Sequence, residues 1–234
     1  MMNKPIALSA FLVALNTPLA AAQMNNDPLL GSILVDRLEV RDRGHSNLNW
    51  ELEGWIGRDL DKLWIKAEGE RNDGRTEGNE LQVLYSHAVA PYWDLQVGVR
   101  QDFEPSPERS WAVIGLQGLA PYFFEIDTAL FIGESGHTAL RLKAEYELLL
   151  TQRWVLVPEL ETNVYGRNDD ESGFGSGLSD LELGLRLRYE VTRKFSPYVG
   201  VVWERKYGNT ADFARQDGES VEEAEFVLGL RAWF

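Results

Sequence analysis

Apolar and polar residues alternate along most of the chain after residue 31, and this alternation restricts the fold more than any other property of the sequence. Between residues 181 and 188, leucine recurs at every second position, with charged residues or glycine between the leucines. Side chains of a β-strand point alternately to its two faces, so a period of two predicts a strand with one apolar face. About twelve segments show this pattern, each roughly ten residues or longer, the length that a tilted strand needs to cross a bilayer. The predicted strands lie near residues 32–42, 47–58, 62–72, 79–90, 92–103, 109–120, 122–133, 137–150, 153–166, 178–191, 195–207 and 222–234.

The predicted connections between these segments are alternately short and long. Short ones such as "VAPYW" and "LTQRW" take turns with longer polar ones such as "RNDGRTEGN" and "GRNDDESGFGSG". Outer-membrane barrels have short periplasmic turns and long extracellular loops. The sequence therefore predicts an all-β fold, a transmembrane antiparallel up-and-down β-barrel of about twelve strands. An even number of strands places both ends of the barrel on the periplasmic side.

The face opposite the apolar one carries many charged residues. A barrel lumen accommodates them because it is polar, whereas the core of a soluble β-sandwich does not. The alternative is a soluble sandwich whose charged face is solvated. Within a lumen, the charges are either a salt-bridge network that fills it or a path and metal site that attract cations. The residues predicted to line the lumen are Glu125, Asp127, Arg141, Lys143, Glu145, Glu147, Glu159, Glu161, Arg186 and Arg188.

Aromatic residues cluster at the ends of the predicted strands, where the interfacial girdles of a membrane barrel lie. The last strand, "EAEFVLGLRAWF", ends on one of them, Phe234. We expect this strand to pair with the first and close the barrel, with Glu225 and Arg231 facing the lumen. A terminal aromatic residue on the last strand resembles the signal that outer-membrane assembly machinery reads. We therefore expect that machinery and outer-membrane lipid to be partners of the chain.

The first 22 residues have the features of a secretory signal peptide. Lys4 precedes an apolar run from Pro5 to Leu15, and Ala20–Ala22 fits the cleavage rule. The alternative is an N-terminal membrane anchor. We predict a signal peptide over residues 1–22, a short periplasmic lead-in over residues 23–31 and the barrel over residues 32–234. The predicted location is the cell outer membrane.

Composition excludes several classes of function. The formal net charge of −14 argues against a nucleic-acid partner, because a polyanion would be repelled. The chain has no cysteine, so disulfides, thiol nucleophiles and cysteine metal sites are excluded.

A serine hydrolase embedded in the barrel is the enzyme that we considered. Ser86 directly precedes His87, so the two side chains point to opposite faces of one strand. His87 shares the apolar face with Tyr85, as an interfacial histidine does. We therefore expect no catalytic residues and no enzymatic activity.

Candidate metal ligands are few. His45 lies beside Asp42 in the first long loop, and His137 lies beside Glu134 in the fourth. If these loops meet at the barrel mouth, imidazole and carboxylate groups there suit a divalent ion. The alternative is that both are ordinary loop histidines. Met24, in the lead-in, is the third candidate.

Several long segments in order resemble the copper resistance protein B family (CopB/PcoB). They include "RSWAVIGLQGLAPYFFEIDTALFIGESG", "LKAEYELLLTQRWVLVPELE", "GSGLSDLELGLRLRYE" and "GNTADFAR", and the resemblance covers about residues 27 to 234. It implies an outer-membrane barrel that helps the cell tolerate or export copper. It also implies copper as an ion that is handled and not tightly held, and a periplasmic copper protein as a partner.

The chain departs from this family at one point. Family members often carry a Met- and His-rich segment before the barrel, in which thioether ligands suit Cu(I) and imidazole suits Cu(II). Here Met24 is the single methionine in "AAQMNNDP". We therefore expect weak copper binding at best. The alternative function is a general outer-membrane pore or structural barrel without metal specificity.

Overall fold

The structure is a computed structural model that describes residues 27–42, 46–72 and 75–234. Within these residues, thirteen strands form one antiparallel sheet. β9 continues the line of β8, so the barrel wall has twelve strand positions, which we call staves. The last strand pairs with the first, with Leu34 opposite Trp233 and Arg41 opposite Val227, and the sheet is closed. The strands are β1 (Leu30–Asp42), β2 (Ser46–Gly57), β3 (Asp61–Asn72), β4 (Arg75–Ala90), β5 (Trp93–Glu104), β6 (Arg109–Ala120), β7 (Phe124–Gly133), β8 (Thr138–Glu145), β9 (Leu148–Leu149), β10 (Trp154–Tyr165), β11 (Gly177–Tyr189), β12 (Phe195–Lys206) and β13 (Glu222–Trp233).

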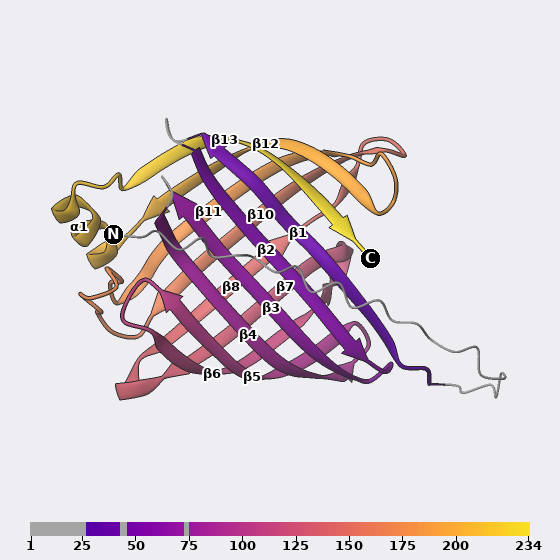
Figure 1. Ribbon diagram of the computed structural model, residues 1–234, viewed down its shortest axis with the longest axis horizontal. Helices are drawn as coiled ribbons and strands as arrows, with labels where there is room; N and C mark the ends of the chain where they lie inside the picture. Colours follow the sequence, from indigo (N-terminus) through magenta and orange to yellow (C-terminus); the bar gives the residue numbers. More distant parts are fainter. Residues whose placement is uncertain (1–26, 43–45, 73–74) are drawn as a thin grey trace, which may run out of the picture.

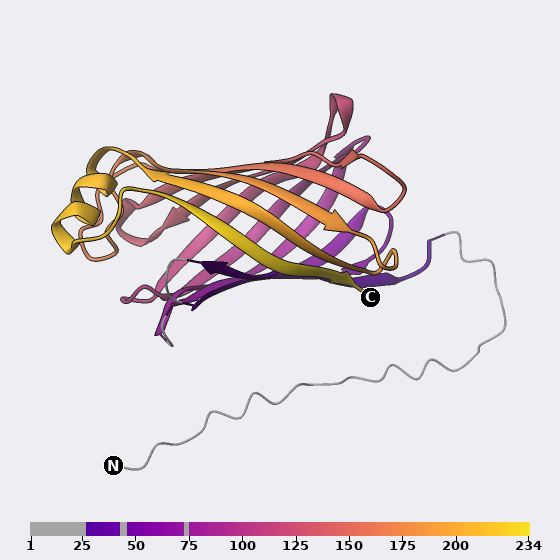
Figure 2. The same ribbon diagram turned by 90° about the horizontal axis from the view of Figure 1, so that it is seen from above.

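This closed barrel confirms the predicted fold class and excludes the soluble sandwich. Figures 1 and 2 show the strands inclined to the long axis of the barrel. The helix α1 (Gly208–Asp217) lies at one end of the barrel. The C-terminus lies at the other end, with the start of β1. The end with α1 carries the connections predicted to be extracellular, and we call it the loop end. The opposite end, with the short turns, is the turn end.

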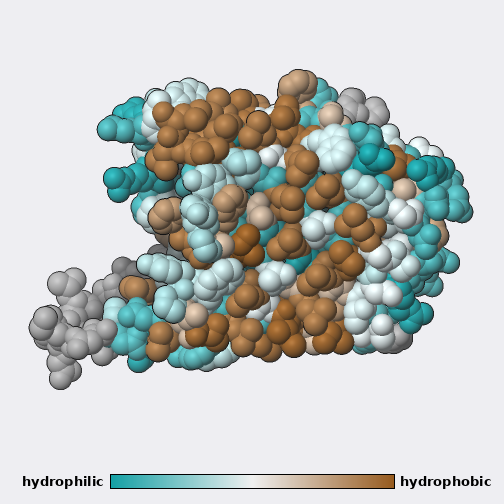
Figure 3. Space-filling model, turned by 180° about the vertical axis from the view of Figure 1, so that it is seen from behind, coloured by the Kyte–Doolittle hydropathy of each residue, from teal (hydrophilic) through white to brown (hydrophobic). Residues whose placement is uncertain are grey.

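The outer surface of the barrel is apolar. Large exposed side chains include Ile33 on β1, Ile65 on β3, Val99 on β5 and Leu228 on β13. Figure 3 shows hydrophobic side chains spread over this surface and hydrophilic ones gathered mainly toward one end. The arrangement inverts that of a water-soluble protein, as expected for a barrel whose outer wall contacts lipid. The described residues contain no helix long and apolar enough to cross a membrane.

The first strand contains a β-bulge, which explains why its sequence alternates poorly. Its register with β2 shifts between Val35 and Arg37, and its register with β13 shifts between Val35 and Leu38. A bulge adds one residue to a strand and changes the face on which the following side chains lie. Both Asp36 and Arg37 consequently line the interior, while Ile33 and Val40 remain outside.

The predicted alternation of short and long connections is correct for only part of the chain. Residues 166–176 and 207–221 form two long connections at the loop end, but only residues 105–108 separate β5 from β6 and residues 134–137 separate β7 from β8. The strands extend into the polar segments that we expected to be loops. A strand ladder is held by backbone hydrogen bonds, so it continues through polar residues once it leaves the bilayer.

The helix α1 was not predicted. Its buried residues are Thr210, Ala211 and Ala214, and it ends at Gly218, whose φ of 79° is the left-handed conformation common after a helix. Thr210 Oγ1 accepts a hydrogen bond from the Gly175 N–H group at 2.8 Å and lies 3.0 Å from Ser179 Oγ. The helix therefore fastens the connection 166–176 to the top of β11.

A charged lumen as the candidate functional site

The interior of the barrel is crossed by ion pairs between strands that lie far apart in the sheet. Arg141 on β8 binds Glu80 on β4 at 2.9 Å and Glu68 on β3 at 3.0 Å. Lys66 on β3 binds Asp127 on β7 at 2.6 Å. Because side chains alternate along each strand, the inward-facing charged residues of many strands converge on the lumen.

A second group of ion pairs centres on Glu39 of β1, whose side chain is completely buried. Its carboxylate binds Arg41 at 2.8 Å and Arg186 of β11 at 3.0 and 3.1 Å, and it accepts a hydrogen bond from the Tyr198 hydroxyl at 3.1 Å. Arg186 also binds Glu159 of β10, which in turn binds Arg37. Buried charges are tolerated in a protein when they are paired in this way.

The structure places every residue predicted to line the lumen on the inside of the barrel wall or at its turn end. Arg141, Lys143, Glu159, Glu161 and Arg186 lie in the central network. Glu125 and Glu145 line a cavity nearer the turn end, and Arg188 binds Glu147 there. Arg231 lies 3.6 Å from Glu147 and 2.7 Å from Asp36.

About half of the charged residues in the network were not among those predicted from the sequence, and most of these lie on β1 to β5. The missed residues alternate with apolar ones in the same way as the predicted ones, so the signal was present on β2, β3 and β4. On β1 the bulge concealed it. The interior residues that were not predicted include Asp36, Arg37, Glu39, Arg41, Glu51, Glu53, Lys66, Glu68, Glu80, Arg100, Asp102 and Glu182.

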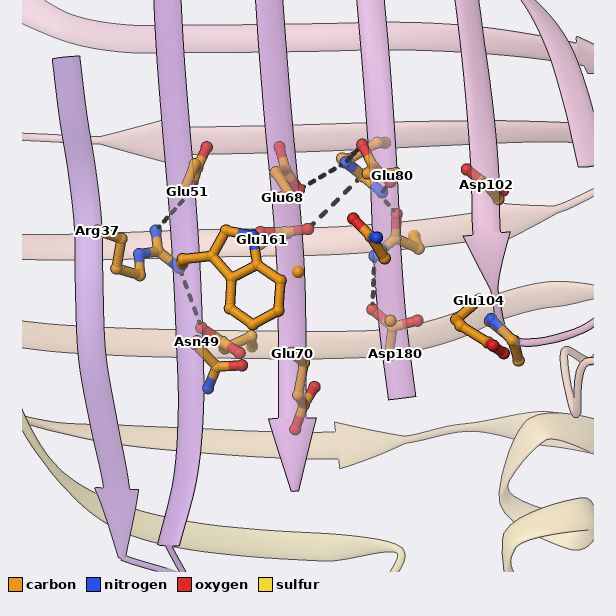
Figure 4. A pocket seen from close by; sticks show the side chains of 18 of the residues that line it. Arg37, Asn49, Glu51, Glu68, Glu70, Glu80, Asp102, Glu104, Glu161 and Asp180 are labelled. Atoms are coloured by element: carbon orange, nitrogen blue, oxygen red, sulfur yellow. Dashed lines mark hydrogen bonds and ion pairs between the residues drawn. The ribbon is translucent and has the colours of Figure 1, made fainter. Parts of the chain in front are cut away.

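Among the described residues, two cavities of several hundred Å³ lie in the lumen, beside smaller ones. The loop-side cavity, of about 360 Å³, is shown from close by in Figure 4. The turn-side cavity, of about 350 Å³, lies toward the opposite end. Both are wide enough for several water molecules, since one water occupies about 30 Å³ of liquid volume.

Carboxylates outnumber cationic side chains around both cavities. Five cationic groups line the loop-side cavity (Arg37, Arg41, Arg100, Arg141 and Lys143) with ten carboxylates, namely Glu51, Glu68, Glu70, Glu80, Asp102, Glu104, Glu161, Asp180, Glu182 and Glu204. Three cationic groups line the turn-side cavity (Arg37, Lys143 and Arg231) with seven carboxylates, namely Asp36, Glu51, Glu53, Glu125, Asp127, Glu145 and Glu159. An excess of one charge sign in a cleft concentrates counter-ions, so this lining should favour cations over anions.

The predicted metal ligands are only partly within the described residues. His137 follows a short 3-10 turn, Glu134–Gly136, at the loop end. Its Nδ1 lies 3.5 Å from Asp169 Oδ2, and its ring is steeply inclined to that of Trp111. Asp169 is also bound by Arg109 at 2.7 Å. His45 and Met24 lie outside the described residues. Among the residues that are described, no three His, Asp or Glu side chains are grouped in a way that would hold a metal ion.

The pair considered for hydrolysis lies on opposite faces of β4. Ser86 is fully buried inside, with Oγ 3.3 Å from Asp94 Oδ2. His87 is exposed on the outer face, where Nδ1 lies 2.7 Å from Asp61 Oδ1 and the Tyr85 hydroxyl binds the same oxygen. Serine and histidine therefore do not contact each other in this part of the barrel.

The closed barrel, its apolar outer wall and its charged lumen define an outer-membrane β-barrel. A NanC porin covers 86% of this chain and 98% of its own, with a TM-score of 0.58 and 14% identity. A KdgM porin covers 87% of this chain and 99% of its own, with a TM-score of 0.51 and 14% identity. At such low identity these solved structures show the fold alone.

The chain belongs to the copper resistance protein B family. The family model described as "Copper resistance protein B precursor (CopB)" matches residues 29–234. A copper resistance protein B homolog of Pseudomonas syringae pv. tomato is 48% identical over 231 residues, covering 98% of this chain and 79% of the relative. Copper resistance protein B of Escherichia coli is 49% identical over 203 residues, covering 86% of this chain and 69% of the relative. The resemblance seen in the sequence is confirmed.

Proposed function

We propose that this barrel supports copper tolerance at the outer membrane by binding copper ions or by helping their export or sequestration. Family membership supports the connection with copper. The observation that carries the mechanism is the excess of carboxylates around both cavities of the lumen. Carboxylate oxygens attract divalent cations and bind them weakly when the geometry is open, so copper is handled as cargo.

The chain must also reach the outer membrane and receive copper there. Residues 1–22 act as a signal peptide cut near Ala22, and the assembly machinery inserts the barrel into outer-membrane lipid. A periplasmic copper protein delivers copper to the turn end. The barrel performs no catalysis.

The proposal is tested by neutralising two carboxylates of the loop-side cavity that form no ion pair among the residues that the structure describes. Asp180 accepts hydrogen bonds from Asn163, and Glu104 accepts them from Ser106. In cells that lack the chromosomal copy, the double variant Asp180→Asn with Glu104→Gln should lower the tolerated copper concentration by roughly two- to tenfold, because a focused negative potential concentrates counter-ions. Survival on graded copper and cell-associated copper are the readouts.

The matched control removes two charges from outside the lumen. Asp59, in the turn between β2 and β3, and Asp212, on α1, are both exposed. Asp59→Asn with Asp212→Asn should leave copper tolerance at the wild-type level. Equal tolerance in the lumen variant, the control and wild type, at equal barrel levels, would contradict the proposal.

A general pore without metal specificity is the second candidate. The fold that the barrel shares with solved porins favours it. This candidate predicts ion conductance in planar bilayers together with copper survival that is unchanged when the gene is removed.

A further inference from the structure

Three side chains line both lumen cavities, and we call them the septum: Arg37 on β1, Glu51 on β2 and Lys143 on β8. Glu51 joins the other two, since its Oε2 lies 3.5 Å from Arg37 Nη2 and its Oε1 lies 2.9 Å from Lys143 Nζ. β2 and β8 lie on opposite sides of the twelve-stave ring. The pair Glu51–Lys143 therefore spans the lumen between the two cavities.

The septum is held from several directions. Lys143 also binds Glu68 of β3 at 2.9 Å and lies 3.7 Å from Glu161 of β10. Arg37 also binds Glu159 of β10. The three septum side chains are only between 11% and 17% exposed. Figure 4 shows Arg37, Glu51, Glu68 and Glu161 directed toward the same central space.

The ammonium group of Lys143 is itself the cation to which the surrounding carboxylates are paired. Three carboxylates from three different strands face it, and the cavities on both sides are themselves rich in carboxylates. Lysine is a compact point charge on a flexible four-carbon stem, so it fills such a position while remaining attached to the wall. A mobile cation in the lumen would have to compete with Lys143 for these carboxylates.

We propose that the lumen is a cation-selective path and that Lys143 closes it as a tethered counter-ion. The three carboxylates that face Lys143, namely Glu51, Glu68 and Glu161, then determine selectivity for cations, as rings of acidic side chains do in cation channels. The inference deepens the proposed function, because it names the class of substrate as small hydrated cations. Only the arm of the experiment that uses copper rests on the proposed function.

The main experiment is conductance of the purified full-length mature barrel in planar bilayers with potassium chloride. Wild type should conduct poorly. Lys143→Met keeps the length of the side chain and removes its charge, and should raise conductance on the order of tenfold, as expected when a negative cleft is freed to concentrate counter-ions. Under a salt gradient, the reversal potential of the variant should have the sign of cation selectivity.

The control is Lys62→Met. Lys62 lies on the inner face of β3, where it binds Asp94 at 3.0 Å, and it lines neither of the two main cavities. This control removes the same charge from the same wall and should conduct as wild type does. Heat-modifiable mobility in gels shows whether each variant forms the barrel.

Loss of Lys143 leaves carboxylates without their cation, which can hinder folding. The double variant Lys143→Met with Glu68→Gln relieves this repulsion and should also conduct cations. A folded barrel of either variant with wild-type conductance would overturn the inference, as would anion selectivity in the variant that conducts.

Copper survival separates the inference from the proposed function. Cation conductance that rises in Lys143→Met, with copper survival unaffected by any lumen variant, upholds the tethered counter-ion and rejects the copper role. Unchanged conductance in folded Lys143→Met, with copper survival lowered by the Asp180 and Glu104 double variant, rejects the tethered counter-ion and upholds the copper role.

Discussion

At the scale of single residues, the sequence identified charged positions but not their partners. Arg186 and Glu159 were predicted to face the lumen, and the structure joins both to residues of β1 that the prediction omitted. Glu39 lies 147 positions from Arg186 in the chain, and only closure of the barrel brings them together. Alternation gives the face on which a side chain lies, but the pairing across the lumen depends on the stagger of all twelve staves.

Glu39 is the residue on which stability should depend most. Glu39→Gln removes the fully buried carboxylate that binds both Arg41 and Arg186 and leaves them only Glu182 and Glu159 as partners, so unfolding free energy should fall by about 3–5 kcal/mol. Tyr198→Phe removes one hydrogen bond to the same carboxylate and should cost about 1 kcal/mol. Urea unfolding of the barrel in lipid vesicles, followed by tryptophan fluorescence, measures both.

An exposed ion pair gives the comparison for this measurement. Lys206 and Glu219 are bound at 2.8 Å at the loop end, where the Glu219 side chain is 60% exposed. Glu219→Gln should change stability by less than about 1 kcal/mol, because water screens the pair. A Glu39 variant no less stable than this one would show that the buried network does not hold the barrel together.

At the scale of elements, the strands were predictable and the structures at the loop end were not. Each predicted strand corresponds to an observed stave within a few residues, since the period of two is strong over ten residues. The helix α1 has ten residues, and its buried side chains are small, so it carries little apolar periodicity. Packing against β11 and the connection 166–176 stabilises it, and such tertiary contacts leave no local signal.

Thr210 should determine whether α1 and the connection 166–176 stay packed together. Thr210→Val removes the acceptor of the Gly175 N–H group, and a buried N–H group without a partner costs about 1–3 kcal/mol. Residues 166–176 should then exchange amide hydrogens faster and be cleaved more readily by protease, with the barrel unchanged. Thr210→Ser keeps the hydroxyl group and should remain protected. Equal protection of residues 166–176 from exchange and protease in both variants would show that the hydroxyl group does not hold this connection against α1.

At the scale of the whole molecule, closure was predictable because a membrane leaves no alternative. An open sheet edge in lipid would expose unpaired backbone groups, so the last strand must meet the first. The structure shows this at the end of the chain, where the Phe234 N–H group donates to the Ile33 carbonyl at 2.9 Å and the Ile33 N–H group donates to the Phe234 carbonyl at 3.1 Å. The division of the lumen was not predictable, because it depends on contacts between opposite staves.

Phe234 belongs to this closure, and its side chain is exposed on the outside. Deletion of Phe234 removes the final pair of backbone hydrogen bonds and the terminal aromatic ring, so the amount of assembled barrel should fall severalfold. Addition of a short charged tail after Phe234 should have a similar effect. Heat-modifiable barrel in outer-membrane fractions is the measurement, and Phe234→Tyr is the control that should assemble normally. Full assembly of the shortened chain would rule out a role for this residue in insertion.

The surplus of carboxylates around the cavities should affect the ion content of each cavity even if no ion passes the septum. Fixed charges that cannot leave a small aqueous compartment set up a Donnan equilibrium with the solution outside it. The Debye length is about 8 Å at physiological ionic strength, comparable with the dimensions of cavities of this size. If the lumen is the cation path proposed above, each cavity should hold mobile cations at a higher concentration than the medium, with divalent ions enriched as the square of the factor for monovalent ions. The barrel would then act as an ion exchanger fixed in the membrane.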